Sequence, residues 1–393
     1  MKTPGRVGVA ETAILAVFAL ASCADAAAPR GSAPRADREP AAEPYVAAPT
    51  PADVVGPSPL VSRRKPIFGR SAVPFARAAY VNDGDARTVW TAGRPTADRP
   101  AWVAVDLGLG PGRVLVTWSA AGSFDYEETD YGSPGAYRLE TSASSTDGED
   151  GAWESALVVP DVTTHGGAHV IAFAGKRWLR FVVTGTPAVS PNGVQLDELE
   201  VRDVSTGLCD AWFFMGDSIT ALAFGRRAPG VMGFSERVRL LHGPRQPAVL
   251  NGGVGGTSSA DGARSIDGWL ARSPDVHFWA IGYGTNDAAG NGTGTGPFRA
   301  NLETLVRRVR AAHREPIFAT IPFASDGQHA GIPLFNAVIG DLQRSYGLHP
   351  GPDLYAWFEA HPEELRDGVH PNEVGVASIN RLWAESAAAL YRR

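Results

Sequence analysis

One stretch of ten residues, Ala211–Thr220, constrains the fold more than any other part of the chain. Its five apolar residues, Ala211–Met215, have the length of a buried β-strand, and Gly216 ends the run. Asp217 and Ser218 then suit the first turn of a helix, where short polar side chains accept hydrogen bonds from free N–H groups. Ser218 is therefore expected at a sharp strand-to-helix turn that exposes its hydroxyl, although the same residues equally suit a simple helix N-cap.

The rest of the C-terminal half alternates between strand and helix patterns. Such alternation predicts a parallel sheet with helices on both faces, and in such sheets sites form at the carboxyl ends of the strands. Strands are expected at Ala211–Met215, Ala248–Leu250, Val276–Ile281, Ile317–Ile321 and near Asp353–Tyr355. Helices are expected near Phe234–His242 and at Ala260–Ala271, Pro297–His313, Pro333–Tyr346 and Asn372–Tyr391.

Four polar clusters follow these strands and should meet on one rim of the sheet. The first is the turn at Ser218, and the other three are Asn251–Thr257, Gly284–Asp287 and Asp367–Pro371. Asp217 and Asp287 within them suit bracing of the loops better than catalysis. A rim of this kind brings residues from distant parts of the chain into one site.

The side chains in these clusters have complementary chemistry. A serine nucleophile such as Ser218 needs a base, and His370 is the candidate. Asp367, three residues earlier, can reach the other ring nitrogen and fix the tautomer. Gly256 can present its N–H, and the Asn286 amide and the Ser218 N–H are further donors for an oxyanion. The set predicts acyl transfer.

The four clusters resemble the motifs of the SGNH (GDSL-type) hydrolase family over about residues 208–393. The motifs are Gly-Asp-Ser, a glycine in Asn-x-x-x-x-Gly, Gly-x-Asn-Asp and Asp-x-x-His, in the family's order. The resemblance implies a flavodoxin-like α/β/α fold. It also implies the family's roles for Ser218, Gly256, Asn286, Asp367 and His370. No cofactor is expected for catalysis, and no Cys/His set has metal-ligand spacing.

From about Phe68 to Val204 short alternating stretches replace helical patterns, which predicts an antiparallel sandwich. Trp90, Trp102 and Trp178 are expected to fill its core, with ligand contact as the alternative. The clearest strands are Trp102–Leu107, Arg113–Trp118, Tyr137–Ser142 and Trp178–Val183.

Four motifs in this region resemble discoidin (F5/8 type C) and galactose-binding-like domains, many of which bind carbohydrate. They are Asp-Gly-Asp-x-x-Thr-x-Trp ending at Trp90, Trp-x-x-Val-Asp-Leu-Gly from Trp102, Arg-Trp-Leu-Arg from Arg177, and Leu-Asp-Glu-Leu-Glu-Val from Leu196. The resemblance implies an all-β jelly roll. It also implies a structural Ca²⁺ bound by the oxygen ligands of Asp83, Asp85, Thr88 and Glu198, although a plain Asp-Gly turn explains the same residues.

An insert at Gly122–Gly135 combines aromatic side chains with carboxylates. Phe124, Tyr126 and Tyr131 suit the apolar faces of a sugar, and the nearby carboxylates suit its hydroxyls. Local packing of loop aromatics would explain the same composition. Sugar binding and local packing both remain open at this point.

The N-terminus has the features of a targeting segment. Lys2 and Arg6 precede the apolar run Ala13–Leu20, and the sequence from Leu20 to Cys23 resembles a bacterial lipobox. The resemblance implies that residues 1–22 are a lipoprotein signal peptide and that Cys23 is lipidated, anchoring an exported protein at the outer membrane or cell surface. An ordinary cleaved signal peptide is the alternative. Either way the protein leaves the cytoplasm.

The predicted organisation is a signal peptide at 1–22, an Ala/Pro-rich tether at 23–66, a β-sandwich at 67–206 and a hydrolase domain at 207–393. The net charge of −6, without a run of Lys or Arg, argues against a nucleic-acid partner. We expect a lipid-anchored esterase that removes O-acyl, and specifically O-acetyl, groups from a carbohydrate or a small ester. A lipase, an acyltransferase and a glycan-binding surface lipoprotein with an inactive hydrolase domain are the alternatives. A fragment of residues 207–393 should still hydrolyse a small soluble ester, unless the sandwich covers an apolar face and its loss causes aggregation.

Overall fold

The computed structural model describes residues 55–391, except 72, 75, 121–131, 163, 188–192, 208, 226–229 and 291. The described residues belong to one compact unit. The predicted signal segment and Cys23 lie outside them. Within the described part of the chain, no helix is long and apolar enough to cross a membrane.

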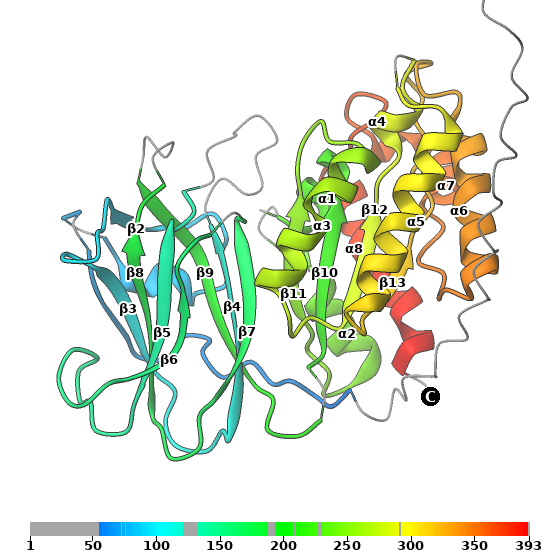
Figure 1. Ribbon diagram of the computed structural model, residues 1–393. Coiled ribbons are helices and arrows are strands. Elements are labelled where there is room, and N and C mark those ends of the chain that lie inside the picture. Colours follow the sequence, from blue (N-terminus) through cyan, green and yellow to red (C-terminus); the bar gives the residue numbers. More distant parts are fainter. Residues whose placement is uncertain are drawn as a thin grey trace, which may run out of the picture. The chain divides into compact units, whose positions relative to one another are not determined.

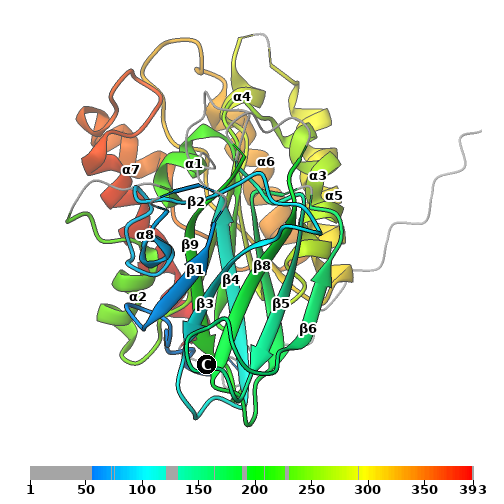
Figure 2. The same ribbon diagram turned by 90° about the vertical axis from the view of Figure 1, so that its left-hand side faces the viewer.

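The N-terminal part forms two antiparallel sheets, called here the N-terminal sheets (Figure 2). One has five strands in the order β1-β3-β8-β5-β6, and the other has four in the order β2-β9-β4-β7. The expected strands are confirmed. The bounds are β1 Ile67–Arg70, β2 Trp90–Gly93, β3 Ala101–Asp106, β4 Arg113–Ala120, β5 Ala136–Ser142, β6 Glu154–Val159, β7 Gly166–Ala172, β8 Trp178–Gly185 and β9 Val194–Asp203, with a 3₁₀ turn at Ala78–Val81.

The three tryptophans expected in the sandwich core are all buried, but they lie in two places. Trp90 belongs to the hydrophobic core between the sheets. Trp102 and Trp178 form a separate small cluster with Trp153 packed against it. The guanidinium of Arg180 lies 3.9 Å from the ring centre of Trp153 and 5.5 Å from that of Trp102. The core prediction is therefore correct for Trp90, whereas Trp102 packs under Arg180 and the ring centre of Trp178 lies 6.0 Å from the guanidinium of Arg177.

Strand β4 of the four-stranded sheet is buried on both faces. Along β4, Val114 and Val116 belong to the core between the sheets, whereas Leu115 belongs to a second cluster. That second cluster also holds Ala168 of β7 and Trp269 of the C-terminal part. The N-terminal sheets therefore cover an apolar face, and the fragment 207–393 on its own would expose it to water.

The end of the predicted tether is packed against the rest of the protein. Val55 lies in a hydrophobic cluster of the C-terminal part, and its carbonyl accepts a hydrogen bond from Arg245. Leu60 forms a β-bridge with Arg202 on β9, and Ser62 Oγ accepts the N–H of Val201. Residues 55–66 are thus not tether. Backbone pairing with β9 and the apolar side chains hold them.

The C-terminal part has the predicted parallel sheet, in the order β11-β10-β12-β13 (Figure 1). Its strands are β10 Ala211–Gly216, β11 Ala248–Gly253, β12 Phe278–Gly282 and β13 Glu315–Phe318. Its helices are α1 Ser218–Phe224, α2 Phe234–His242, α3 Ser259–Arg272, α4 Thr285–Ala288, α5 Thr295–Ala311, α6 Ile332–Tyr346, α7 Leu354–Ala360 and α8 Glu373–Tyr391, with a 3₁₀ turn at Pro362–Glu364.

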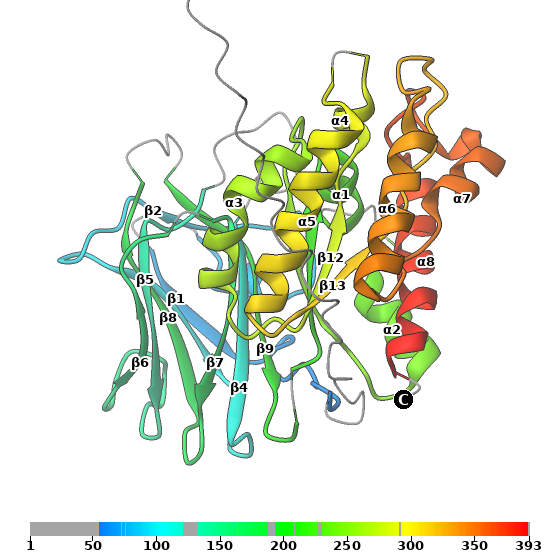
Figure 3. The same cartoon turned by 45° about the vertical axis from the view of Figure 1, so that its right-hand side comes forward.

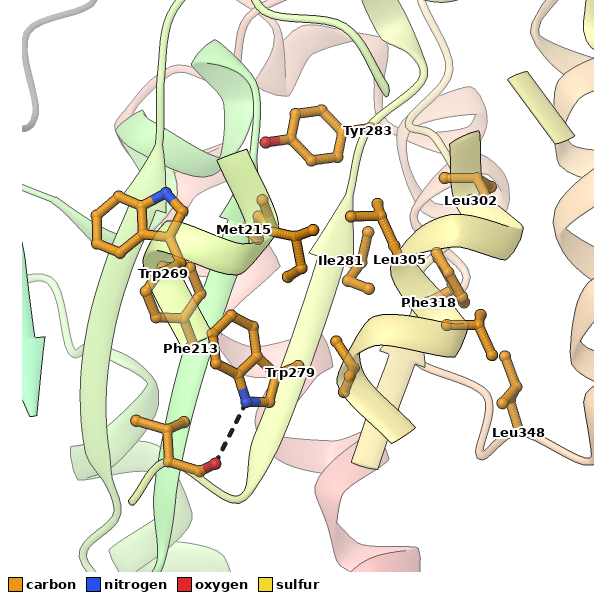
Figure 4. Close-up of a cluster of buried hydrophobic side chains, with 14 of the residues drawn as sticks. Phe213, Met215, Trp269, Trp279, Ile281, Tyr283, Leu302, Leu305, Phe318 and Leu348 are labelled. Carbon is orange, nitrogen blue, oxygen red and sulfur yellow. Dashed lines mark hydrogen bonds between the residues drawn. The ribbon is translucent and has the colours of Figure 1, made fainter. Parts of the chain in front are cut away.

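Helices cover this sheet on both faces, as Figure 3 shows. Side chains alternate along β10, so that Phe213 and Met215 pack with α3, α5 and α6 (Figure 4). Trp212 and Phe214 pack in the opposite cluster with α2 and α8. In Figure 4 the indole of Trp279 also donates to the carbonyl of Val276, at 3.3 Å. This double burial explains why the strand reads as an unbroken apolar run.

The strand expected near Asp353–Tyr355 is wrong. Asp353 is the N-cap of α7, and its carboxylate accepts the N–H of Ala356 at 3.1 Å. Leu354 and Phe358, four residues apart, are the buried residues of that helix, which is helical spacing rather than strand spacing. In place of the expected strand, a single isolated parallel bridge joins Pro350 to Phe318 of β13.

Candidate active site

Ser218 lies where the sequence places it, at the turn from β10 into α1. Asp217 is the N-cap of α1, and its Oδ1 accepts the N–H of Ile219 at 2.9 Å. Ser218 is the first residue of the helix and is 6% exposed. The turn therefore fixes the serine backbone while a small part of the side chain reaches solvent.

A line of hydrogen bonds joins Ser218 to His370 and Asp367. Ser218 Oγ lies 2.9 Å from His370 Nε2, and His370 Nδ1 lies 2.8 Å from Asp367 Oδ2. A carboxylate accepts only, so the geometry assigns the ring proton to Nδ1 and leaves Nε2 to accept from the serine hydroxyl. The side chain of His370 is 20% exposed, which gives the ring access to solvent.

Asp367 is held as a carboxylate by its own turn. Burial favours its neutral form, but the N–H groups of His370 and Val369 and the imidazole outweigh burial and lower the pKa of Asp367 to about 2. The backbone N–H bonds measure 2.7 Å from His370 and 3.0 Å from Val369. A bridge between Leu365 and Pro371 closes the turn. The negative charge beside the histidine therefore persists across the neutral pH range.

The two other predicted loops meet beside this turn. Asn286 Nδ2 donates to Thr257 O at 2.7 Å, which joins the third motif to the second. Val254 N–H donates to Gly216 O at 3.0 Å, which joins the second to the serine turn. Gly256 is exposed with φ +71°, a left-handed conformation that favours glycine. The structure thus brings all four motifs to one end of the sheet.

Residues 214–377 match the family model of the GDSL-like Lipase/Acylhydrolase family. The match begins within β10 and includes the serine turn and the Asp367–His370 turn. The C-terminal part is therefore similar to GDSL-like hydrolases along this stretch, and it is here called the hydrolase domain. No curated protein matches the chain.

The solved structures that are similar to this chain each cover less than half of it. A lipase/acylhydrolase from Enterococcus faecalis is 25% identical, covers 46% of this chain and 95% of its own, and has a TM-score of 0.40. Axe2, an acetylxylan esterase from Geobacillus stearothermophilus, is 20% identical, covers 48% and 96%, and has a TM-score of 0.38. A chitosan-binding module from a chitosanase/glucanase of Paenibacillus sp. IK-5 is 24% identical, covers 36% and 98%, and has a TM-score of 0.27.

The two other acidic residues of the GDSL-like motifs make the bracing contacts expected of them. Asp287 accepts the N–H of Ser259 at 2.9 Å and its hydroxyl at 2.5 Å, which ties α4 to the start of α3. Asp217 is buried, and burial raises its pKa to about 6 against the opposing hydrogen bond from Ile219. Neither carboxylate is hydrogen-bonded to His370 in the way that Asp367 is.

The predicted calcium ligands largely satisfy one another. Asp83 accepts the hydroxyl of Thr88 at 2.9 Å and the N–H of Asp85 at 2.8 Å, while Asp85 binds the guanidinium of Arg87 at 2.5 and 2.7 Å. Among the described residues, no three or more His, Cys, Asp or Glu are placed to hold a metal ion. As arranged, this turn fits an Asp-Gly turn better than a calcium site, and calcium binding stays a prediction.

Glu198, the fourth predicted ligand, lines the same pocket as Asp83 and Asp85. Both of its carboxylate oxygens are buried and lack a hydrogen-bond partner. Burial, followed by the charge of Glu200, raises its pKa to about 9. Glu198 is therefore held in its neutral form at pH 7. The predicted sugar-binding residues Phe124, Tyr126 and Tyr131 lie outside the described residues.

Proposed function

We propose that this chain is an exported serine esterase that hydrolyses O-acyl esters with Ser218, His370 and Asp367. The observation that carries the proposal is the hydrogen-bonded line from Asp367 through His370 to Ser218, at a strand-to-helix turn inside the GDSL-like stretch. The line has the order and direction that nucleophilic catalysis by serine requires.

In the first step Ser218 Oγ attacks the ester carbonyl carbon. His370 Nε2, 2.9 Å away, accepts the hydroxyl proton, and the Asp367 carboxylate stabilises the resulting imidazolium. When the tetrahedral intermediate collapses, the bond to the alcohol oxygen breaks and His370 donates the proton to that oxygen. An acyl group then remains on Ser218. Water attacks it with His370 again as base, which releases the acid and restores the serine.

Three donors are proposed to stabilise the negative oxygen of each tetrahedral intermediate. They are the backbone N–H groups of Ser218 and Gly256 and the side-chain amide of Asn286. The hydrogen bond from Asn286 to Thr257 uses one of its two N–H groups and fixes the plane of the amide, so the second keeps a defined direction. A donor held in this way needs no reorganisation when charge develops.

The substrate we propose is an O-acetylated glycan. The support is the resemblance of the N-terminal sheets to the jelly rolls of discoidin-type carbohydrate-binding domains, together with the aromatic residues Phe124, Tyr126 and Tyr131. A lipid at Cys23 would keep the enzyme at the outer membrane or cell surface. Membrane fractionation tests this, because Cys23→Ser should move the protein from the membrane to the soluble fraction.

Acetate release from a panel of acetylated polysaccharides, beside p-nitrophenyl esters of increasing chain length, tests the proposed function. We expect acetate from at least one polysaccharide, a preference for short acyl chains, and no release by Ser218→Ala. Faster turnover of long chains would indicate a lipase, and acyl transfer to an added sugar would indicate a transferase. A folded wild-type protein that binds glycan but turns over no ester would be an inactive hydrolase and would contradict the proposal.

A further inference from the structure

A histidine of the N-terminal sheets makes a buried contact with the hydrolase domain. His165 lies in the turn just before β7 and is 4% exposed. Its Nε2 lies 3.1 Å from the backbone carbonyl oxygen of Asn251 on β11. Its ring meets Trp269 of α3 edge-on, with ring centres 4.8 Å apart. The second GDSL-like motif is thus touched by a residue from outside the family match.

The contact sits in a continuous, well-packed interface. Leu115 and Ala168 share one hydrophobic cluster with Trp269. Beside this cluster the N–H of Val170 donates to the carboxylate of Asp275 at 2.8 Å. Apolar packing on one side and a charge-assisted hydrogen bond on the other leave the turn that carries His165 little freedom to move.

Asn251 connects that contact to the serine helix. Its side-chain amide donates to Ala221 O on α1 at 3.1 Å, and its Oδ1 accepts the N–H of Gly253 at 2.9 Å. The strand and the helix are so close that a Cβ on Gly253 would lie 2.2 Å from Ala221 N. A shift of Asn251 therefore moves the helix that begins with Ser218 and the loop that carries Gly256.

The protonation state of His165 allows its ring to donate a hydrogen bond to Asn251 throughout the neutral pH range. Burial lowers the pKa of His165 to about 4, although the hydrogen bond to Asn251 opposes the change. The ring is then neutral at pH 7. Because a carbonyl oxygen only accepts, the contact assigns the ring proton to Nε2.

We propose that His165 is a positioning residue of the active site, whose Nε2–H group holds Asn251 and thereby fixes the serine helix relative to the loop that carries Gly256. The N-terminal sheets are then part of the framework of catalysis as well as a candidate binding module. This inference rests on the proposed esterase function, since its kinetic effect is read as turnover by Ser218.

The chain offers a matched control four residues away. His169 on β7 is also buried with its pKa lowered to about 4 by burial, and its Nε2 lies 2.7 Å from Tyr137 Oη within the N-terminal sheets. His165→Leu removes the buried hydrogen bond to Asn251, and His169→Leu removes the one to Tyr137 on the same segment of the chain. Only the first removes one to the hydrolase domain.

Kinetics with p-nitrophenyl acetate separate the two variants. We expect His165→Leu to lower kcat roughly tenfold with little change in KM, and His169→Leu to leave kcat within about twofold of wild type. His165→Gln, whose amide N–H comes close to the position of Nε2, should recover most of the loss. If His165→Leu fails to fold, His165→Asn replaces it, because the shorter amide does not reach Asn251. Equal kcat for the His165 and His169 variants would overturn the proposal.

Hydrogen exchange gives a readout that does not depend on turnover. In His165→Leu the amides of residues 249–257 and 218–224 should exchange faster than in wild type and in His169→Leu. If the wild type lacks esterase activity but this difference appears, the proposed function fails and the positioning role stands. If the wild type is active and exchange in these segments is unchanged, the positioning role is refuted alone.

Discussion

The active-site rim and the interface between the N-terminal sheets and the hydrolase domain each contain a histidine, and the two side chains are held in opposite ways. His370 is one-fifth exposed and binds the carboxylate of Asp367. His165 is 4% exposed, binds a backbone carbonyl and packs against an indole. The carboxylate of Asp367 orients the His370 ring toward Ser218, whereas burial keeps His165 neutral.

The difference shows that the surroundings of a histidine, and not the residue type, decide whether it takes part in the reaction or holds other residues in place. The rim consists of loops at strand ends, joined by hydrogen bonds between polar groups. The interface consists of strand and helix side chains such as Leu115 and Trp269 that exclude water. Substitutions at the rim should therefore change rates, and substitutions of the apolar interface residues should mainly change stability, whereas the proposed positioning role makes His165 the exception.

The largest expected effect is at the rim. Ser218→Ala should lower kcat/KM for p-nitrophenyl acetate on the order of 10⁴-fold or more, because it removes the attacking oxygen. The melting temperature should stay close to that of the wild type. Activity that survives in the purified variant would show that another residue attacks the ester.

Asn286→Ala should have a smaller effect in the same assay. Loss of one oxyanion donor lowers kcat by about 10²–10³-fold. Asn301→Ala is the matched control, since its amide donates to Ser259 Oγ and reaches no reacting atom. A similar loss in both variants would mean that the cause is support of α3 and not the oxyanion.

At the interface, Leu115→Ala should lower the free energy of unfolding by about 2–5 kcal/mol, as expected for a cavity in a packed core. Urea denaturation measures the change. Leu109→Ala, at a side chain that is 77% exposed, should change it by less than about 0.5 kcal/mol. Indistinguishable values would mean that the apolar contact between the two parts does not persist in solution.

The smallest effect concerns Asp217 and depends on pH. Since burial raises its pKa to about 6, the folded chain keeps a proton between pH 4 and 6 that the unfolded chain releases. This contribution stabilises the fold at low pH and is lost as the pH rises through 6. Asp217→Asn cannot titrate, so the stability of the wild type relative to the variant should fall by on the order of 1–3 kcal/mol from pH 5 to pH 8. A constant difference would contradict this.

Sequence patterns were sufficient for the rim because its chemistry demands particular residue types at strand ends. Ser218, Asn286 and His370 could be named for that reason. The strand near Asp353–Tyr355 was wrong because a short apolar run fits either structure, and the Asp353 cap decides for a helix. His165 left no pattern to find, since its partner is the backbone of a residue 86 positions away.

The interface could not be predicted, because the sequence left open whether the sandwich covers an apolar face of residues 207–393. In the structure five consecutive residues of β4, Val114 to Trp118, are buried. The alternation of apolar and polar residues along a strand shows which face lies in the core of its own domain. It does not show whether the other face contacts solvent or another domain, because small and mixed side chains suit either. Whether the hydrolase domain covers the outer face of β4 depends on tertiary structure, which the strand pattern does not record.

Burial of β4 on both faces has a consequence for how the protein tolerates mutation. When each residue of a strand with one solvent-exposed face is substituted in turn, charged residues are tolerated at every second position. Between Val114 and Trp118 we expect no such alternation, and aspartate should destabilise the fold at each position. The strand would then behave like the central strand of a parallel sheet, although its neighbours run antiparallel.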